Sequence, residues 1–212
     1  MPKRPIIMVS STVYGIEELL EKIYTELTLF KYEVWMSHKG TLPVRSDRTA
    51  FENCLAAVDE CDLFLGIITP AYGSGRDGAD LSITHQELQR AIARKKPRWL
   101  LAHHDVVFAR RLLRDLGYKT PAERAALNVA KSAKSLSDLR VIDMYEDATR
   151  DTVPLADRYG NWVQEFVTDK DATLYAQAQF SRFQEVERFL KENFTDPAAV
   201  MQALQDKQDE TP

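Results

Sequence analysis

Residues 62–97, which read DLFLGIITPAYGSGRDGADLSITHQELQRAIARKKP, carry the pattern that decides the fold. Asp62–Ile68 is a nearly continuous apolar run, which is typical of a strand buried on both faces of a parallel sheet. The next segment, Thr69–Leu81, contains one proline and three glycines and predicts a long loop. A helix from about Thr84 to Lys95 follows, so the stretch predicts a strand, a loop and a helix in that order.

Similar units occur on both sides of this stretch. Apolar runs at Pro5–Ser10, Glu33–Met36 and Arg98–Ala102 predict three more strands, and Leu139–Ile142 is the candidate for a fifth. A helix with apolar residues at 3.6-residue spacing, from about Tyr14 to Phe30, joins the first two strands. Strands that alternate with helices predict an α/β fold with a five-stranded parallel sheet and right-handed crossovers. We take the strand order 2-1-3-4-5 as our hypothesis.

The second half of the chain departs from this alternation. Residues 103–138 read as a helical insertion between the fourth and fifth strands, and residues 161–194 read as mostly helical. We therefore expect an α/β domain over residues 1–160, a C-terminal helical segment over 161–194 that packs on the same domain, and a polar tail over 195–212.

Composition excludes several classes of protein. The formal net charge of −4 and the pI of about 5.6 give no basic footprint, so we expect no nucleic-acid partner. No apolar run approaches the ~20 residues of a membrane helix, so we expect no membrane partner. Cys54 and Cys61 lie in one predicted helix and its exit, which suits neither a disulfide nor a zinc site. These features predict a cytoplasmic protein.

The loops that follow the first and third strands are the expected ligand site. In open parallel sheets, ligands bind beyond the carboxyl ends of the strands, where the strand order reverses. Both loops are rich in hydroxyl residues or glycine and lead into helix N-termini, which suit anions and predict a small-molecule nucleotide as partner. Neither GxGxxG nor GxxxxGK[ST] is present. The candidate ligand-binding residues in these loops are Ser10, Ser11, Thr12, Tyr14, Gly73, Ser82 and Thr84.

Glu87 is the candidate for chemistry, and two interpretations of it stay open. Thr84 and Glu87 match the T-x-x-E capping box, in which the carboxylate would bond back to the helix N-terminus. Alternatively, Glu87 points into the ligand crevice as a nucleophile or charge stabiliser. Tyr72 or Trp35 could stack on a base, although either ring could simply pack in the core or at its rim. The adjacent His103 and His104 would leave a strand on opposite faces, so no metal site is expected.

Three segments carry a family resemblance: MVSSTVYGIEELL, AVDECDLFLGIITPAYGS and SITHQELQRAIARKKP. Together they resemble a bacterial family of uncharacterised domains that open with a V-S-S-T motif and are related to the TIR (Toll/interleukin receptor) fold. The resemblance covers roughly residues 5–102. It implies a flavodoxin-like sheet, a relation to NAD-cleaving TIR domains, self-association into a homo-oligomer or a larger assembly, and a role in defence or stress signalling.

The run Glu87–Ala91 also resembles the corresponding run of nucleoside 2-deoxyribosyltransferases, from which it departs because Gln89 replaces a glycine. Both resemblances imply that Glu87 carries the chemistry of an N-glycosidic bond, with NAD+ or a related nucleotide as substrate or ligand and with no separate cofactor. Three functions remain: NAD+ hydrolysis, nucleoside transfer, and a non-catalytic module that senses a nucleotide or self-assembles.

Overall fold

The computed structural model describes the backbone of residues 4–73, 81–130, 133 and 135–193, and the side chains of these segments as far as residue 182. Gly75 and Gly78 of the predicted loop and the predicted tail at 195–212 lie outside the described residues. In chain order, the elements are β1 (Ile6–Ser11), α1 (Glu17–Leu29), β2 (Glu33–Trp35), α2 (Ala50–Glu60), β3 (Leu63–Ile68), α3 (Ile83–Ala93), β4 (Arg98–His103), α4 (His104–Asp115), α5 (Pro121–Ala125), α6 (Arg140–Thr149), η1 (Leu155–Asp157), β5 (Val163–Phe166) and α7 (Asp169–Asn193).

The five strands form one parallel sheet in the order β2-β1-β3-β4-β5, which confirms the predicted α/β fold and strand order. β1 lies near the centre, where Ile7 is in register with Val34 on one side and with Leu63 on the other. Continuous apolar runs form these inner strands because helices cover both faces of the sheet. The architecture is consistent with a flavodoxin-like fold.

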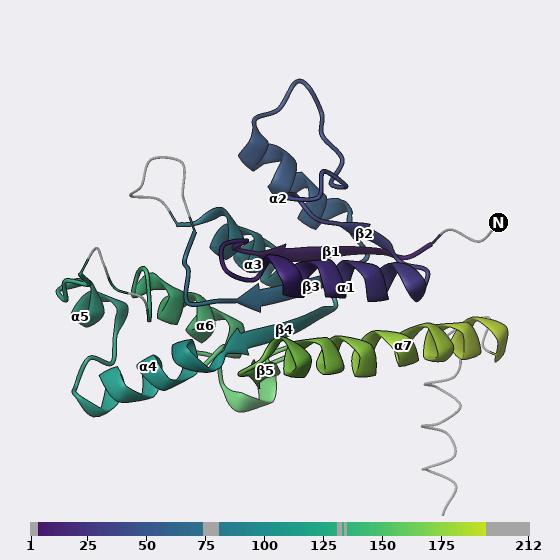
Figure 1. The fold of residues 1–212 in the computed structure, drawn as a ribbon. Helices are drawn as coiled ribbons and strands as arrows, with labels where there is room; N and C mark the ends of the chain where they lie inside the picture. The colour runs from purple at the N-terminus through teal and green to yellow at the C-terminus, as the bar shows by residue number, and fades with distance from the viewer. Residues whose placement is uncertain (1–3, 74–80, 131–132, 134, 194–212) are drawn as a thin grey trace, which may run out of the picture.

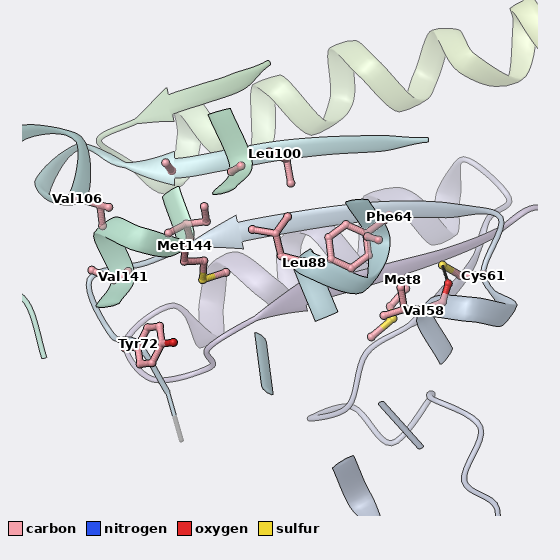
Figure 2. Close-up of a cluster of buried hydrophobic side chains, with 14 of the residues drawn as sticks. Met8, Val58, Cys61, Phe64, Tyr72, Leu88, Leu100, Val106, Val141 and Met144 are labelled. Atoms are coloured by element: carbon pink, nitrogen blue, oxygen red, sulfur yellow. Dashed lines mark hydrogen bonds between the residues drawn. The ribbon is translucent and has the colours of Figure 1, made fainter. Parts of the chain in front are cut away.

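Successive side chains along each strand point to opposite faces of the sheet and pack into two separate cores. On one face, Met8, Phe64 and Leu100 pack against α2, α3 and α6. Figure 2 shows these three side chains, from β1, β3 and β4, directed into the same cluster as Leu88 of α3. On the other face, residues such as Leu65 pack against α1 and α7, which run along the sheet together (Figure 1).

The fifth strand is not where the sequence pattern placed it. Leu139–Ile142 runs into α6, because Val141, Met144 and Ala148 recur at helical spacing and are all buried. The strand is instead VQEF at residues 163–166, inside the segment predicted as helical. It is an edge strand with polar residues at its centre, so it lacks the continuous apolar run that marks the inner strands.

The connection between β4 and β5 is accordingly longer than the predicted insertion at 103–138. It contains α4, α5, α6 and η1, and α6 packs on the sheet beside α3. The predicted boundary at residue 160 is followed directly by a strand of the same sheet. Among the helices that the structure describes, none combines the length and apolar character needed to cross a membrane.

Candidate functional site

Ser10 and Glu87 meet at the carboxyl end of β1. Ser10 is the fifth residue of β1, and Glu87 is the fifth residue of α3, the helix that follows β3. The Ser10 hydroxyl donates a hydrogen bond to Oε2 of Glu87. Both side chains are buried, with exposed fractions of 2% for Ser10 and 5% for Glu87. The carboxyl group therefore lies at the sheet edge where the strand order reverses, which is where the sequence placed the site.

Cys54 of α2 is the third member of this cluster. Its thiol is hydrogen-bonded to the Glu87 carboxyl group. Burial raises the pKa of Glu87 to about 7, although the hydrogen bonds from Ser10 and Cys54 oppose that rise. Burial and the neighbouring Glu87 charge raise the pKa of Cys54 to about 12, so its thiol stays protonated and can donate. The site thus holds one carboxyl group near its titration midpoint at neutral pH.

The capping-box interpretation of Glu87 is wrong. The N-cap of α3 is Ser82, two residues before the predicted Thr84, and its side chain accepts a hydrogen bond of 3.3 Å from the backbone of His85. Glu87 lies two residues too far along the helix to complete a box with Ser82, because a capping box pairs the N-cap with the third helical residue, here His85. Its carboxyl group points to Ser10 instead.

The loops after β1 and β3 are in direct contact. The Ser11 hydroxyl donates to the carbonyl of Ile67, across the β1–β3 pair, at 3.0 Å. Thr12 is buried beside Gly73, where an added Cβ would lie 2.9 Å from the Thr12 Oγ1 and 3.7 Å from the Cβ of Ser82. Thr12, Gly73 and Ser82 therefore lie close together where the two loops meet, and Ser10 is the residue of this group that contacts the Glu87 carboxyl group.

The two aromatic candidates for stacking are not open to a ligand. Tyr72 is 2% exposed and Trp35 is 6% exposed, and both belong to the core on the α3 face. The guanidinium of Arg140 lies over the Tyr72 ring at 4.8 Å from its centroid. Figure 2 shows Tyr72 within the buried cluster. The aromatic candidate at the molecular surface is Tyr14, which is 81% exposed and follows β1 by three residues.

A buried polar chain that sequence reasoning missed supports the start of α3. His85, 2% exposed, contacts the Tyr72 hydroxyl through Nδ1 at 2.8 Å and the Asp147 carboxylate through Nε2 at 2.9 Å. Gln89 donates to the same carboxylate at 2.8 Å. The spacing of four between His85 and Gln89 was a usable signal, because it places both on one helix face. Thr84, a predicted ligand residue, is buried in the first turn of this helix.

The two adjacent histidines bind different partners. His103 caps α4 by accepting from the backbone of Asp105 at 3.2 Å, and His104 contacts Glu165 of β5 through Nδ1. Within the described part of the chain, no group of three or more metal-ligating side chains comes together.

The family model of DUF4062, a domain of unknown function, matches residues 6–193, from the first residue of β1 to the last residue of α7. The chain belongs to the DUF4062 family. Ser10, Cys54 and Glu87 all lie within the matched region of this DUF4062 domain. No curated protein matches the chain.

Proposed function

We propose that this DUF4062 domain cleaves the N-glycosidic bond of NAD+ or a related nucleotide, with Glu87 as the catalytic carboxylate. The observation that carries the proposal is the position of Glu87. Its carboxyl group is buried at the strand-reversal edge and held by donors from two other elements, Ser10 of β1 and Cys54 of α2. A carboxylate in so dry a setting is costly, and such strained ionisable groups cluster at functional sites.

The chemistry needs few groups. The bond between ribose C1′ and the nicotinamide nitrogen breaks, and its electron pair leaves with nicotinamide. Positive charge then develops on the ribose, where the Glu87 carboxylate stabilises it or traps it covalently. Water adds its hydroxyl to C1′ and releases a proton. Hydrogen bonds from Ser10 and Cys54 favour the ionised form of Glu87 that this step requires.

The remaining candidates would bind and orient the nucleotide. In this proposal, Ser11, Thr12, Gly73, Ser82 and the start of α3 at Thr84 contact ribose or phosphate, since hydroxyls and a helix N-terminus suit anions. The exposed ring of Tyr14 takes over the base-stacking role from Tyr72 and Trp35, whose rings are buried. Free Cys54 and Cys61 suit the reducing cytoplasm, which remains the proposed location.

A second candidate is a non-catalytic module that senses a nucleotide or assembles with copies of itself. The observation in its favour is that Glu87 is only 5% exposed and already hydrogen-bonded to Ser10 and Cys54. Catalysis would require the nucleotide to displace one of these contacts. Self-association and a role in defence or stress signalling rest on the family resemblance, and transfer of the sugar to a second base is a variant of the catalytic proposal.

One substitution separates the two candidates. Glu87→Gln keeps the size and an acceptor for Ser10 but removes the charge, so NAD+ turnover by the purified chain should fall at least a hundredfold. Glu60→Gln makes the same change at an exposed site on α2 and should retain wild-type turnover. Nicotinamide release, followed by liquid chromatography, is the measurement.

Turnover that persists in Glu87→Gln would refute the catalytic role. A wild-type chain that releases no base from NAD+ or nucleosides, even when concentrated enough to self-associate, would favour the binding module.

A further inference from the structure

A pocket lies at the opposite end of the sheet from Glu87. It has a volume of about 280 Å³ and lies between α7 and the β4–β5 edge of the sheet. Arg98, the first residue of β4, lines it, whereas Ser10 lies near the end of β1. Because all the strands are parallel, their starts and their ends form opposite edges. The residues that line the pocket are Arg98, Trp99, Trp162, Gln164, Tyr175 and Gln179.

Strand register brings the two tryptophans together. β4 and β5 pair Leu101 with Gln164, so Trp99 and Trp162, each two residues earlier, are neighbours on the same face. That face carries α7, where Tyr175 supplies the opposite wall of the pocket.

The aromatic rings that line the pocket are positioned so that a planar ligand could stack on them. Trp162 is 71% exposed, which is an unusual position for the largest side chain. The Trp99 ring packs on Phe180 of α7, with the centroids 4.9 Å apart, and is held in place by this contact. Burial raises the pKa of Tyr175 to about 12, so its phenol is neutral and can donate a hydrogen bond.

Arg98 adds a positive charge that the protein does not neutralise. Its Nη2 donates to the carbonyl of Tyr159 at 2.6 Å and its Nη1 to the carbonyl of Lys96 at 3.4 Å. Its Nε is buried without a hydrogen-bond partner. Over the residues that the structure describes, no carboxylate forms an ion pair with it. Burial and the nearby Arg150 both lower the pKa of Arg98, as expected for a cation without an anion.

The chain also holds this guanidinium in a fixed position. Gly160 adopts φ +63°, and a Cβ at that position would lie 2.8 Å from the Arg98 Cζ. Glycine is favoured at this φ, and its lack of a Cβ lets the backbone pack directly against the guanidinium. The Tyr159 carbonyl comes from the same turn and sets the orientation of the charge.

We propose that this pocket binds a mononucleotide, with its base against Trp162 and Trp99 and its phosphate on Arg98. The rings provide sequence-independent stacking, and the Gln164 and Gln179 amides can meet the donor and acceptor groups of a base edge. Arginine matches phosphate geometry. The volume is just below the range of about 300–1,000 Å³ that is typical of ligand pockets, which suits one nucleotide better than a dinucleotide. The site is independent of Glu87 and of the function proposed for it.

The test is calorimetric titration of the full chain with AMP, with adenosine and inorganic phosphate as comparison ligands. AMP should bind, and both comparison ligands should bind at least tenfold more weakly, because each keeps only half of the contacts. Equal affinity for AMP and adenosine would refute the role of Arg98.

Two variants locate the binding. Trp162→Ala removes an exposed ring and should weaken AMP binding at least tenfold, as should Arg98→Gln. The matched control is Phe108→Ala, which removes a ring that is 53% exposed on α4 and should bind AMP as the wild type does.

Wild-type affinity in Trp162→Ala would overturn the proposal, as would a wild-type chain that binds no AMP at millimolar concentration. A dimer that Trp162→Ala dissociates, without any AMP binding, would identify the surface as a protein interface instead and would equally overturn it.

Discussion

The Ser10 hydroxyl donates a hydrogen bond to the Glu87 carboxyl group, and these two residues lie 77 positions apart in the chain. The bond joins the inner strand β1 to α3 at the edge where the strand order reverses. It also holds a carboxyl group in a place that water scarcely reaches, since Glu87 is 5% exposed. Burial sets the energetic cost of the Glu87 charge, and Ser10 and Cys54 offset part of it.

Glu87 should make the stability of the protein depend on pH. Its pKa rises from an ordinary 4.5 to about 7 on folding, so the folded state binds the proton more tightly than the unfolded state. The stability that this proton provides is complete below pH ~4.5 and is lost as the pH rises to ~7. The loss amounts to about 3 kcal/mol, at about 1.4 kcal/mol per pKa unit.

Urea unfolding of wild type and Glu87→Gln between pH 4.5 and 8 measures this effect. The wild type should lose stability relative to Glu87→Gln across that range, while Glu60→Gln should follow the wild type. Parallel curves for wild type and Glu87→Gln would contradict a raised pKa.

Ser10→Ala should raise the pKa of Glu87 further. The substitution removes a hydrogen bond that favours the ionised carboxylate. Hydrogen bonds to charged groups contribute about 1.5–3 kcal/mol, so the pKa should rise by about one to two units. Titration of the Glu87 carboxyl carbon by NMR measures it directly, and any Glu87-dependent activity should move to higher pH in parallel. Ser11→Ala is the control, because its hydroxyl donates to the Ile67 carbonyl; an equal shift in both variants would refute the assignment.

Gly73→Ala should be more destabilising than Gly15→Ala. Both glycines have φ +82°, so alanine at either position is destabilising by about 1 kcal/mol, because an L-residue is strained in the left-handed conformation. An added Cβ has open space at Gly15 but would lie 2.9 Å from the Thr12 Oγ1 at Gly73, which adds about 1–3 kcal/mol of overpacking. Thermal unfolding measures both. The extra cost should shrink when Thr12→Ala removes the opposing atoms, and an unchanged cost in that background would rule out the clash.

Arg124→Met should destabilise the helices between β4 and β5. Arg124 is 2% exposed and donates to the carboxylates of Asp143 and Glu146 on α6. Without it Asp143 loses its ion-pair partner, while Glu146 keeps its ion pair with Arg110, and we expect a cost of about 3 kcal/mol. Burial raises the pKa of Asp143, so the deficit should shrink as the pH falls toward 4 and this carboxylate is protonated.

Chemical unfolding of Arg124→Met at pH 7 and pH 4 provides the measurement. Arg45→Met breaks an exposed ion pair with Glu60 and should cost less than about 1 kcal/mol. An equal loss of unfolding free energy in the two variants would show that the buried ion pairs of Arg124 stabilise the protein no more than an exposed one does.

The local sequence pattern was sufficient to predict the inner strands of the sheet but not the edge strand β5. Asp62–Ile68 predicted β3 because a strand covered on both faces is apolar throughout. Leu139–Ile142 looks the same over four residues, but it belongs to α6, whose apolar residues continue at helical spacing. β5 pairs on one side only and has two adjacent polar residues at its centre, so VQEF carried too short a signal to outweigh the helical pattern after it.

Some features of the candidate site could likewise be predicted from the sequence, and others could not. The sequence by itself determined that hydroxyl-rich and glycine-containing loops end the central strands and that Glu87 begins the helix beside them, because these features are local. Only the tertiary structure decided that Ser82 caps α3, that Cys54 joins Ser10 on the Glu87 carboxyl group, and that Tyr72 and Trp35 are buried. Burial and long-range hydrogen bonds arise when separate elements pack on one sheet, and residue spacing within a single element does not specify them.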